Sequence, residues 1–167
     1  MVLPDMLKNG LDVVFCGTAP GNISARRGAY YAADSNKFWA VLHRTGLTPR
    51  LFAPCEYPLA FELGIGFTDV AKERFGVDSQ LRKTDFDRQA FLRKILTFKP
   101  RVLCFTGKRS AQEAYGLKTS KDIVYGRQQK KIGETVVFVL PSPSAAAIRW
   151  WDESYWREAA GYIRGQA

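Results

Sequence analysis

The sequence predicts an α/β fold with three layers, in which helices cover both faces of a central, mostly parallel sheet of four strands. Three observations predict this fold: short apolar runs end at glycine or proline, segments with helical spacing lie between them, and no internal repeat or low-complexity linker divides the chain. Of its 167 residues, 46% are hydrophobic and 13% are aromatic, which is enough for one sizeable core. We therefore expect residues 1–167 to form a single domain.

The expected strands are four short runs rich in apolar and β-branched residues. In chain order they are residues 11–16, 65–68, 102–106 and 135–140. The first and third runs end at Gly17 and Gly107, and the last one stops at Pro141. Continuous apolar runs of this length are typical of strands that are buried on both faces of a parallel sheet.

Four segments have the spacing of amphipathic helices. Apolar residues recur every three or four positions in Phe38, Val41 and Leu42 before Gly46, and in Phe91, Leu92, Ile95 and Leu96 before Pro100. Residues 110–115, which end at Gly116, and residues 152–163, with Asp152 as the expected N-cap, supply two more helices. Residues 116–131 are rich in charge, and we expect them to form a surface excursion.

The charge of the chain favours a polyanionic partner. Lysine and arginine total 25 against 16 acidic residues, a formal net charge of +9 that favours nucleic acid through counterion release. Many basic domains are merely soluble, however, so charge alone leaves both interpretations open. No apolar stretch has the length of a membrane helix and the N-terminus lacks the layout of a signal peptide, so we expect a cytoplasmic protein with no membrane partner.

The cysteine and histidine content argues against a metal centre. Cys16, Cys55 and Cys104 lie far apart without a CxxC pair, and His43 is the one histidine. Cys16 and Cys104 fall inside apolar runs, where a free thiol usually acts as a small buried hydrophobe. We therefore predict no zinc, no iron-sulfur cluster and no catalytic cysteine.

The loops that follow the four expected strands should converge, because ligands of open parallel sheets bind outside the carboxyl ends of the strands. The first loop, residues 17–24, offers small residues and free backbone amides that suit an anion or a carbonyl oxygen. It matches neither the Gly-Lys-Ser/Thr ending of a phosphate-binding loop nor the Gly-x-Gly-x-x-Gly dinucleotide fingerprint. The sequence therefore disfavours an ATP or NAD site.

Four short motifs, taken together in their order and spacing, carry a resemblance to a known family. They are Gly-Thr-Ala-Pro-Gly-Asn-Ile-Ser at 17–24, Gly-Ala-Tyr-Tyr-Ala at 28–32, Asn-Lys-Phe-Trp at 36–39 and Leu-Pro-Ser-Pro-Ser at 140–144. From about Val13 to the last expected helix, the chain resembles the mismatch-specific uracil-DNA glycosylases of the uracil-DNA glycosylase superfamily. The resemblance implies a monofunctional N-glycosylase, without a cofactor, that flips uracil or another deaminated base out of DNA and hydrolyses its bond to the sugar. We expect it to act as a monomer.

By this resemblance, the first loop and the segment after it form the base pocket. The expected base-binding residues are Thr18, Ala19, Asn22, Ser24 and Tyr31. Tyr31 occupies the place of an aromatic residue that stacks on the flipped base, which suits a ring because every base has a π-face. Thr18 and Ser24 would line the pocket, mainly through backbone groups. The alternative for Tyr31 and its neighbour Tyr30 is that both pack under the loop, as aromatic residues usually do.

The first loop departs from the family at its catalytic position. Many members of this branch carry an asparagine there to position the attacking water, whereas this chain has Ala19, whose methyl group cannot orient water. We predict that Asp69 replaces it, because a carboxylate stabilises the positive charge that develops on the sugar, and some relatives with a similarly altered loop carry an aspartate in this segment. Asn22 is a weaker candidate. Alternatively, Asp69 or Thr68 caps a short helix that begins near Val70.

The predicted DNA contacts come from one helix start and from the last loop. They are Lys108, Arg109, Ser142, Ser144, Ala145, Ala146, Ala147 and Arg149. By the resemblance, residues 145–149 match the wedge that fills the space vacated by the flipped base, and Ala146 is small for this job. We infer that the wedge, with Ile148 or Arg149 filling space, distinguishes the opposite base poorly.

Two other functions stay open on the sequence alone. Ala19 is also compatible with a catalytically weak or inactive protein that binds damaged DNA. An unrelated nucleotide-binding α/β protein is the third interpretation. A lyase is disfavoured, because no lysine is clearly placed to form a Schiff base.

Overall fold

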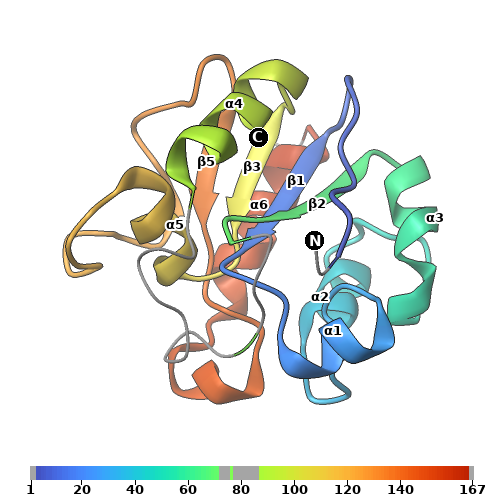
Figure 1. The fold of residues 1–167 in the computed structure, drawn as a ribbon. Coiled ribbons are helices and arrows are strands. Elements are labelled where there is room, and N and C mark those ends of the chain that lie inside the picture. Colours follow the sequence, from blue (N-terminus) through green and yellow to red (C-terminus); the bar gives the residue numbers. More distant parts are fainter. Residues whose placement is uncertain (1–2, 72–75, 77–86, 166–167) are drawn as a thin grey trace.

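A five-stranded sheet forms the centre of the molecule in the computed structural model, which describes residues 3–71, 76 and 87–165 (Figure 1). The elements in chain order are β1 Val13–Gly17, α1 Asn22–Arg27, α2 Phe38–Arg44, η1 Pro54–Glu56, α3 Tyr57–Glu62, β2 Ile65–Asp69, α4 Arg88–Phe98, β3 Val102–Phe105, α5 Lys108–Tyr115, β4 Gly126–Arg127, β5 Val136–Val139, η4 Ala145–Trp150 and α6 Glu153–Ile163. The strand order is β2-β1-β3-β5-β4, and the first four of these strands are parallel. The α/β class and the mostly parallel sheet are thus confirmed.

The sheet has one strand more than the sequence predicts. β4 pairs antiparallel with β5, with Gly126 opposite Val139 and Arg127 opposite Phe138. It lies inside residues 116–131, where we expected only a surface excursion. The sequence misses β4 because two residues are too few to show either alternation or an apolar run.

The side chains of the central strands alternate between two apolar clusters, one on each face of the sheet. On β1, Val13 and Phe15 belong to one cluster, whereas Val14 and Cys16 belong to the other. Helices α2 and α6 complete the first cluster, and α4 and α5 complete the second. Figure 1 shows α6 behind the strands and α4 and α5 on the opposite side. Because both faces are covered, the strands appear in the sequence as continuous apolar runs.

All four predicted helices are present. The Asp152 carboxylate caps α6 by accepting a hydrogen bond from the Ser154 amide at 2.9 Å, as expected for an N-cap. Helix α5 ends at Gly116, whose φ of 67° is the left-handed conformation that glycine adopts without strain. The sequence missed α1 and α3, because six residues are too few to establish a helical period. In the part of the chain that the structure describes, no helix is long and apolar enough to cross a membrane.

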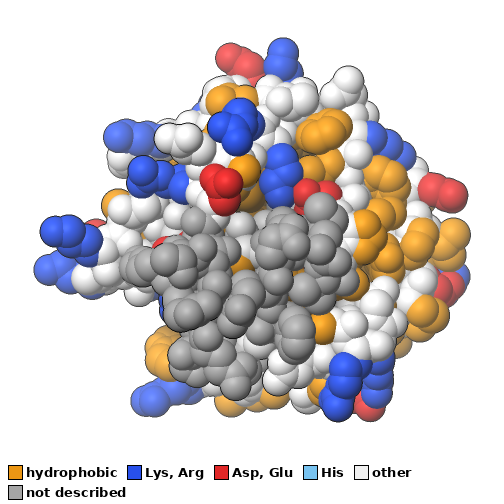
Figure 2. Space-filling view, in the orientation of Figure 1, with side chains coloured by type: hydrophobic (Ala, Val, Ile, Leu, Met, Phe, Trp, Pro, Cys, Tyr) orange, Lys and Arg blue, Asp and Glu red, His pale blue; other side chains and the backbone are white. Residues whose placement is uncertain are grey.

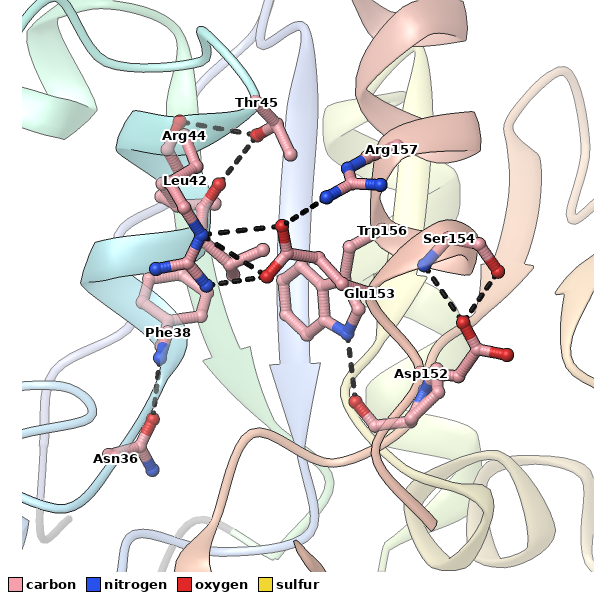
Figure 3. Close-up of polar contacts among 12 residues, drawn as sticks. Asn36, Phe38, Leu42, Arg44, Thr45, Asp152, Glu153, Ser154, Trp156 and Arg157 are labelled. Carbon is pink, nitrogen blue, oxygen red and sulfur yellow. Dashed lines mark hydrogen bonds and ion pairs between the residues drawn. The ribbon is translucent and has the colours of Figure 1, made fainter.

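Helix α6 is fixed to α2 and to the loop after β5 by polar contacts (Figure 3). Arg44 Nη2 lies 2.5 Å from Glu153 Oε1, and Arg157 Nη2 donates to Glu153 Oε2 at 3.1 Å. On the buried side of α6, the Trp156 indole N–H donates to Pro141 O at 2.9 Å. The hydrogen bond from Arg44 lowers the pKa of the Glu153 carboxyl below its usual value. These contacts position the last loop relative to the core.

We expect Glu153→Gln to lower the free energy of unfolding by about 1 kcal/mol near pH 7, because it removes the charge from a pair with Arg44 that has good hydrogen-bond geometry. A carboxyl whose pKa is lowered in the folded protein stabilises it above the unfolded-state pKa, and this stabilisation is lost as the pH falls through the folded-state pKa. The difference between the variant and the unaltered protein should therefore begin to shrink as the pH falls below the ordinary carboxyl value of 4.5, and it should vanish below the lowered folded-state pKa. Urea unfolding across this pH range measures the difference.

The matched control is Glu158→Gln, which changes an exposed glutamate of the same helix. It should leave the unfolding free energy nearly unchanged at every pH. A Glu153→Gln difference that keeps its full size in acid would show that the charge of Glu153 is not its source.

Candidate active site

The candidate active site lies where the carboxyl ends of β1 and β2 meet. The parallel register places Gly17, the last residue of β1, beside Asp69, the last residue of β2. Backbone hydrogen bonds continue past the strand ends: the Val70 amide donates to Gly17 O at 3.0 Å, and the Ala71 amide donates to Thr18 O at 2.7 Å. The loop after β1 is therefore held against the segment after β2, as expected for converging strand ends.

Three polar side chains converge on Gly17. A Cβ atom at this position would lie 3.0 Å from Asp69 Oδ1, 3.6 Å from Thr106 Oγ1 and 3.8 Å from the Tyr31 hydroxyl oxygen. The three groups come from β2, from the end of β3 and from the segment before α2, so only the tertiary fold brings them together. A Cβ at position 17 would be in tight contact with the Asp69 carboxylate, which favours glycine here.

Asp69 is buried beside two tyrosines. Only 4% of its surface is exposed, and strand alternation puts it on the same face of the sheet as Phe67. Burial raises the pKa of Tyr31 well above its usual value, and the negative charge of Asp69 raises it further. The same two causes, in the same order, raise the pKa of Tyr30. Both phenols therefore stay protonated, and hence able to donate a hydrogen bond, at neutral pH.

The Tyr31 ring is held in a defined position. Its hydroxyl lies 3.0 Å from Thr106 Oγ1, and because Thr106 donates its own hydrogen to Cys16 O at 3.3 Å, Tyr31 is the donor of this bond. The ring stacks on Phe38, with centroids 3.9 Å apart and an interplanar angle of 15°. The φ of Tyr31 is 52°, a left-handed conformation that is unfavourable for a bulky residue and persists only where surrounding contacts impose it.

The two tyrosines differ in their surroundings. Tyr30 is only 3% exposed, donates its hydroxyl hydrogen to Pro4 O at 2.8 Å and stacks on Phe67 with centroids 5.1 Å apart. It therefore packs in the core, against β2 and the N-terminal segment. Tyr31 is half-buried, so its packing on Phe38 leaves it partly accessible.

The other expected base-binding residues occupy the loop after β1 and helix α1. Thr18 and Ala19 are half-buried in this loop. Ser24 is buried in α1, and its hydroxyl oxygen accepts a hydrogen bond from the Ala32 amide at 3.0 Å, so this side chain fixes the segment that carries Tyr31. Asn22, the weaker catalytic candidate, is exposed at the first position of α1.

Thr68, the alternative N-cap of a helix near Val70, makes side-chain contacts with two other segments. Its hydroxyl donates to Asp5 Oδ1 at 2.7 Å and accepts a hydrogen bond from Lys94 Nζ at 3.0 Å. Thr68 thus ties the N-terminal segment and α4 to β2. The helix that Thr68 or Asp69 would cap was expected to begin near Val70, and its further course falls on residues 72–75 and 77–86, which lie outside the described residues.

The Ser-Pro-Ser loop after β5 is joined to the segment that precedes α2. The Lys37 amide donates to Pro143 O at 2.9 Å. Within the loop, Ser142 Oγ accepts from the Ser144 amide and Ser144 Oγ accepts from the Ala146 amide, each at 3.3 Å. Because these bonds use the hydroxyl oxygens as acceptors, the hydroxyl hydrogens can still be donated to an anion such as a phosphate.

Lys108 and Arg109 open α5 next to this loop, where the sequence places phosphate contacts. The glycine before them lies so close to the loop that a Cβ on it would be 3.6 Å from Ser142 Cβ. The Lys108 ammonium lies 4.5 Å from the centroid of the Tyr125 ring, and Arg109 Nε donates to Oε1 of buried Glu113 at 3.1 Å. Both cations are thus near the site, and both already have an intramolecular contact.

The predicted wedge forms the 3-10 segment η4. Residues 145–147 are its three alanines, with a non-helical kink at the third, where φ is −107°. Ile148 and Arg149 are exposed. Whether either residue fills the space of a flipped base stays a prediction. The structure adds Trp150, which is 56% exposed and which the sequence analysis missed. The adjacent tryptophans at 150 and 151 were the available signal, because neighbouring residues of a single helical turn rarely both face the core.

Cys16 and Cys104 lie in strands β1 and β3 beside this site, whereas Cys55 lies in η1. Cys16 and Cys104 are buried in the sheet, Cys55 is exposed, and burial raises the pKa of the Cys104 thiol. Within residues 3–71, 76 and 87–165, no group of three or more His, Cys, Asp and Glu side chains could hold a metal ion.

Two comparisons with known proteins agree with this architecture. The family model of the uracil DNA glycosylase superfamily matches residues 4–161, which is almost the whole chain. A solution NMR structure of a protein described as a "putative Uracil DNA glycosylase" from Methanosarcina acetivorans has a similar fold, with a TM-score of 0.60 and 22% sequence identity. The similarity covers 97% of this chain and 96% of that chain, so it supports the fold as a whole.

We expect Tyr31→Phe and Thr106→Val each to lower the free energy of unfolding by about 1 kcal/mol, because each removes one partner of the hydrogen bond between them. The double variant should cost less than the sum of the single variants, since the same bond can be lost only once. Urea unfolding of the four proteins gives the coupling energy.

Thr45→Val is the matched control, because the Thr45 hydroxyl bonds to Val41 O within the same turn of chain rather than to Tyr31. Its effect should add to that of Tyr31→Phe. If the losses of unfolding free energy also add fully when Tyr31→Phe is combined with Thr106→Val, the assigned bond between Tyr31 and Thr106 is contradicted.

Proposed function

Because the chain belongs to the uracil DNA glycosylase superfamily, we propose that it is a monofunctional DNA glycosylase that removes uracil, and other deaminated bases, from DNA by hydrolysis. One observation carries the proposal: the buried Asp69 carboxylate and the Tyr31 hydroxyl approach the same residue, Gly17, at the carboxyl end of β1. In this proposal the partner is DNA, no cofactor takes part and the protein acts as a cytoplasmic monomer.

The proposed reaction separates charge across the bond between the base and the sugar. When this bond breaks, its electron pair leaves with the base, so negative charge develops on the base and positive charge on the sugar. A carboxylate beside the sugar stabilises the positive charge, and the effect is strong where burial excludes water. Asp69 is the buried carboxylate at the strand ends, and backbone amides of the loop around Thr18 would hold an oxygen of the departing base.

Water completes the proposed reaction. Its oxygen forms the new bond to the sugar carbon, and its proton passes through the Asp69 carboxylate to solvent, while the departing base takes up a proton. Asp69 would thereby orient the water that a methyl group at Ala19 cannot orient. The short approach between Asp69 and Gly17 supports this assignment, because it places the carboxylate against the loop in which Ala19 lies.

Tyr31 is proposed to stack on the everted base. Fully buried Phe38 supports one face of its ring, so the opposite face is the one that a base would cover. The hydroxyl bond to Thr106 fixes the ring before any base arrives, which reduces the entropy lost on binding. Ser24 contributes indirectly, because it fixes the segment that carries Tyr31.

A protein that binds damaged DNA without releasing a base is the second candidate. The observation that favours it is Ala19, which lacks any group able to take part in proton transfer. Such a protein would keep the stacking tyrosine and the basic surface. The two candidates therefore differ in turnover and not in binding.

We expect Asp69→Asn to slow uracil release about 10²- to 10⁴-fold while leaving DNA affinity within about 3-fold, because the substitution keeps the shape of the side chain and removes its charge. The measurement is release of free base from a labelled oligonucleotide that contains one uracil, under single-turnover conditions. Binding of the same oligonucleotide is measured in parallel.

Asp122→Asn is the matched control, since Asp122 is exposed in the excursion between α5 and β4. It should release uracil at the unaltered rate. If the unaltered protein binds uracil-containing DNA but releases no base, the second candidate is correct. If Asp69→Asn releases uracil at the unaltered rate, Asp69 is not the catalytic carboxylate.

We also expect weak discrimination of the base opposite uracil, because Ala146 is too small to fill the space that the flipped base vacates. Release rates from a single strand, an A·U duplex and a G·U duplex should then agree within about 10-fold, a difference of about 1.4 kcal/mol in activation free energy. Strict dependence on the G·U duplex would contradict this inference. Ala146→Leu, which restores a larger wedge, should raise the preference for the G·U duplex.

A further inference from the structure

Segment η4 exposes two large apolar side chains at the same edge of the molecule as the candidate active site. Ile148 is 60% exposed and Trp150 is 56% exposed. An indole ring is the largest apolar side chain, and leaving half of it in water forgoes the free energy that burial would give. Exposed aromatic rings of this kind are characteristic of binding surfaces.

The exposure of Trp150 is imposed by a well-anchored backbone. The Ser144 hydroxyl oxygen caps the start of η4, and the Trp151 amide donates to Ile148 O at 3.1 Å at its end. The next residue, Trp151, packs against Trp156 with ring centroids 5.8 Å apart. Because Trp151 faces the core, the geometry of the turn directs Trp150 outward.

Positive charge lies over one face of the exposed indole, so the opposite face is the one open to a ligand. The Arg149 guanidinium carbon is 5.1 Å from the centroid of the Trp150 ring, and the Lys37 ammonium is 5.8 Å from the ring of Trp151. The whole chain carries a formal charge of +9. The Trp150 indole thus offers a flat apolar face with cations nearby. An unpaired nucleobase complements it, because the base is flat and apolar and is joined to an anionic phosphate backbone.

We propose that Trp150 stacks on an unpaired nucleobase of single-stranded DNA, at a nucleotide that flanks the one whose base is released. This inference rests on the proposed function for the identity of the polymer. In a duplex both faces of each base are already stacked, so only a single strand or an opened site offers a face to the indole. Arg149 would contact the adjoining phosphate, which is a charge contact without base preference. The consequence is a contribution to affinity that single strands gain and closed duplexes do not.

The test is the affinity for a single-stranded oligonucleotide that contains no uracil, compared with a duplex of the same sequence, measured by fluorescence anisotropy at one fixed salt concentration. Trp150→Ala should weaken binding of the single strand about 5- to 100-fold, the range expected for loss of one base–aromatic stack, and binding of the duplex less than about 2-fold. Trp150→Phe, which keeps a smaller aromatic ring, should retain most of the single-strand affinity.

Leu51→Ala is the matched control, because Leu51 is an apolar side chain of nearly equal exposure, at 57%, in a different segment. It should change neither affinity. Unaltered single-strand affinity in Trp150→Ala would overturn the inference, and so would an equal loss for strand and duplex, which would indicate a general backbone contact. If Trp150→Phe loses as much as Trp150→Ala despite unchanged melting temperatures, stacking is again refuted.

The readout is independent of catalysis, because the oligonucleotide has no base to release. A protein that binds single strands through Trp150 but releases no uracil would support this inference while refuting the proposed enzyme. A protein that releases uracil with Trp150→Ala binding unchanged would do the reverse.

Discussion

The close approach of β1 and β2 at Gly17 and Asp69 is the constraint on which the site depends. The parallel register sets these residues side by side at the carboxyl ends of their strands, and an added Cβ at Gly17 would already lie 3.0 Å from the Asp69 carboxylate. The backbone bonds from Val70 and Ala71 then fix the first loop against this pair. A side chain at position 17 would therefore press on the Asp69 carboxylate, whereas its contacts with Thr106 and the Tyr31 hydroxyl would be ordinary van der Waals contacts.

The position of Tyr31 has a conformational cost that its neighbours offset. A left-handed φ costs a non-glycine residue about 1–2 kcal/mol. The stack on Phe38 and the hydroxyl bond to Thr106 each contribute stabilisation of about the same size. Ser24 and Arg27 hold the segment from outside the ring, through bonds to the backbone of Ala32. The strain is thus localised at Tyr31, whose hydroxyl approaches Gly17 together with the Asp69 carboxylate.

The core strands and long helices could be predicted because each one carries its own pattern within a few residues. Val13 to Cys16 and the other central strands are apolar on both faces, and α4 and α6 are long enough to show a helical period. The short elements β4, α1 and α3 contain too few residues for such a pattern. The location of Asp69 beside the first loop follows from the rule that parallel strand ends converge.

The side-chain geometry of the site could not be predicted in the same way. The Tyr31–Thr106 bond joins residues 75 positions apart, and no local pattern encodes a contact of this kind. The exposure of Trp150 depends on which of two adjacent tryptophans packs on Trp156, and hydrophobicity alone assigns both to the core. Resemblance predicts which residues belong to the site, whereas their orientation is a property of the tertiary fold.

On the face shown in Figure 2, the positive charge of the described residues is not gathered into one stripe. In Figure 2 the Lys and Arg side chains form separate groups at the edges and across the upper part of this face, while the largest apolar area lies on the side of α3. Lys108 and Arg109, which open α5, already contact Tyr125 and Glu113, and cations held in such contacts are less available to replace the counterions of a polyanion. In the proposed function, register on DNA would then come from groups with fixed geometry. The serine hydroxyls of the last loop and the indole that follows them have this property, because the loop is anchored to Trp156 and Lys37 on its buried side.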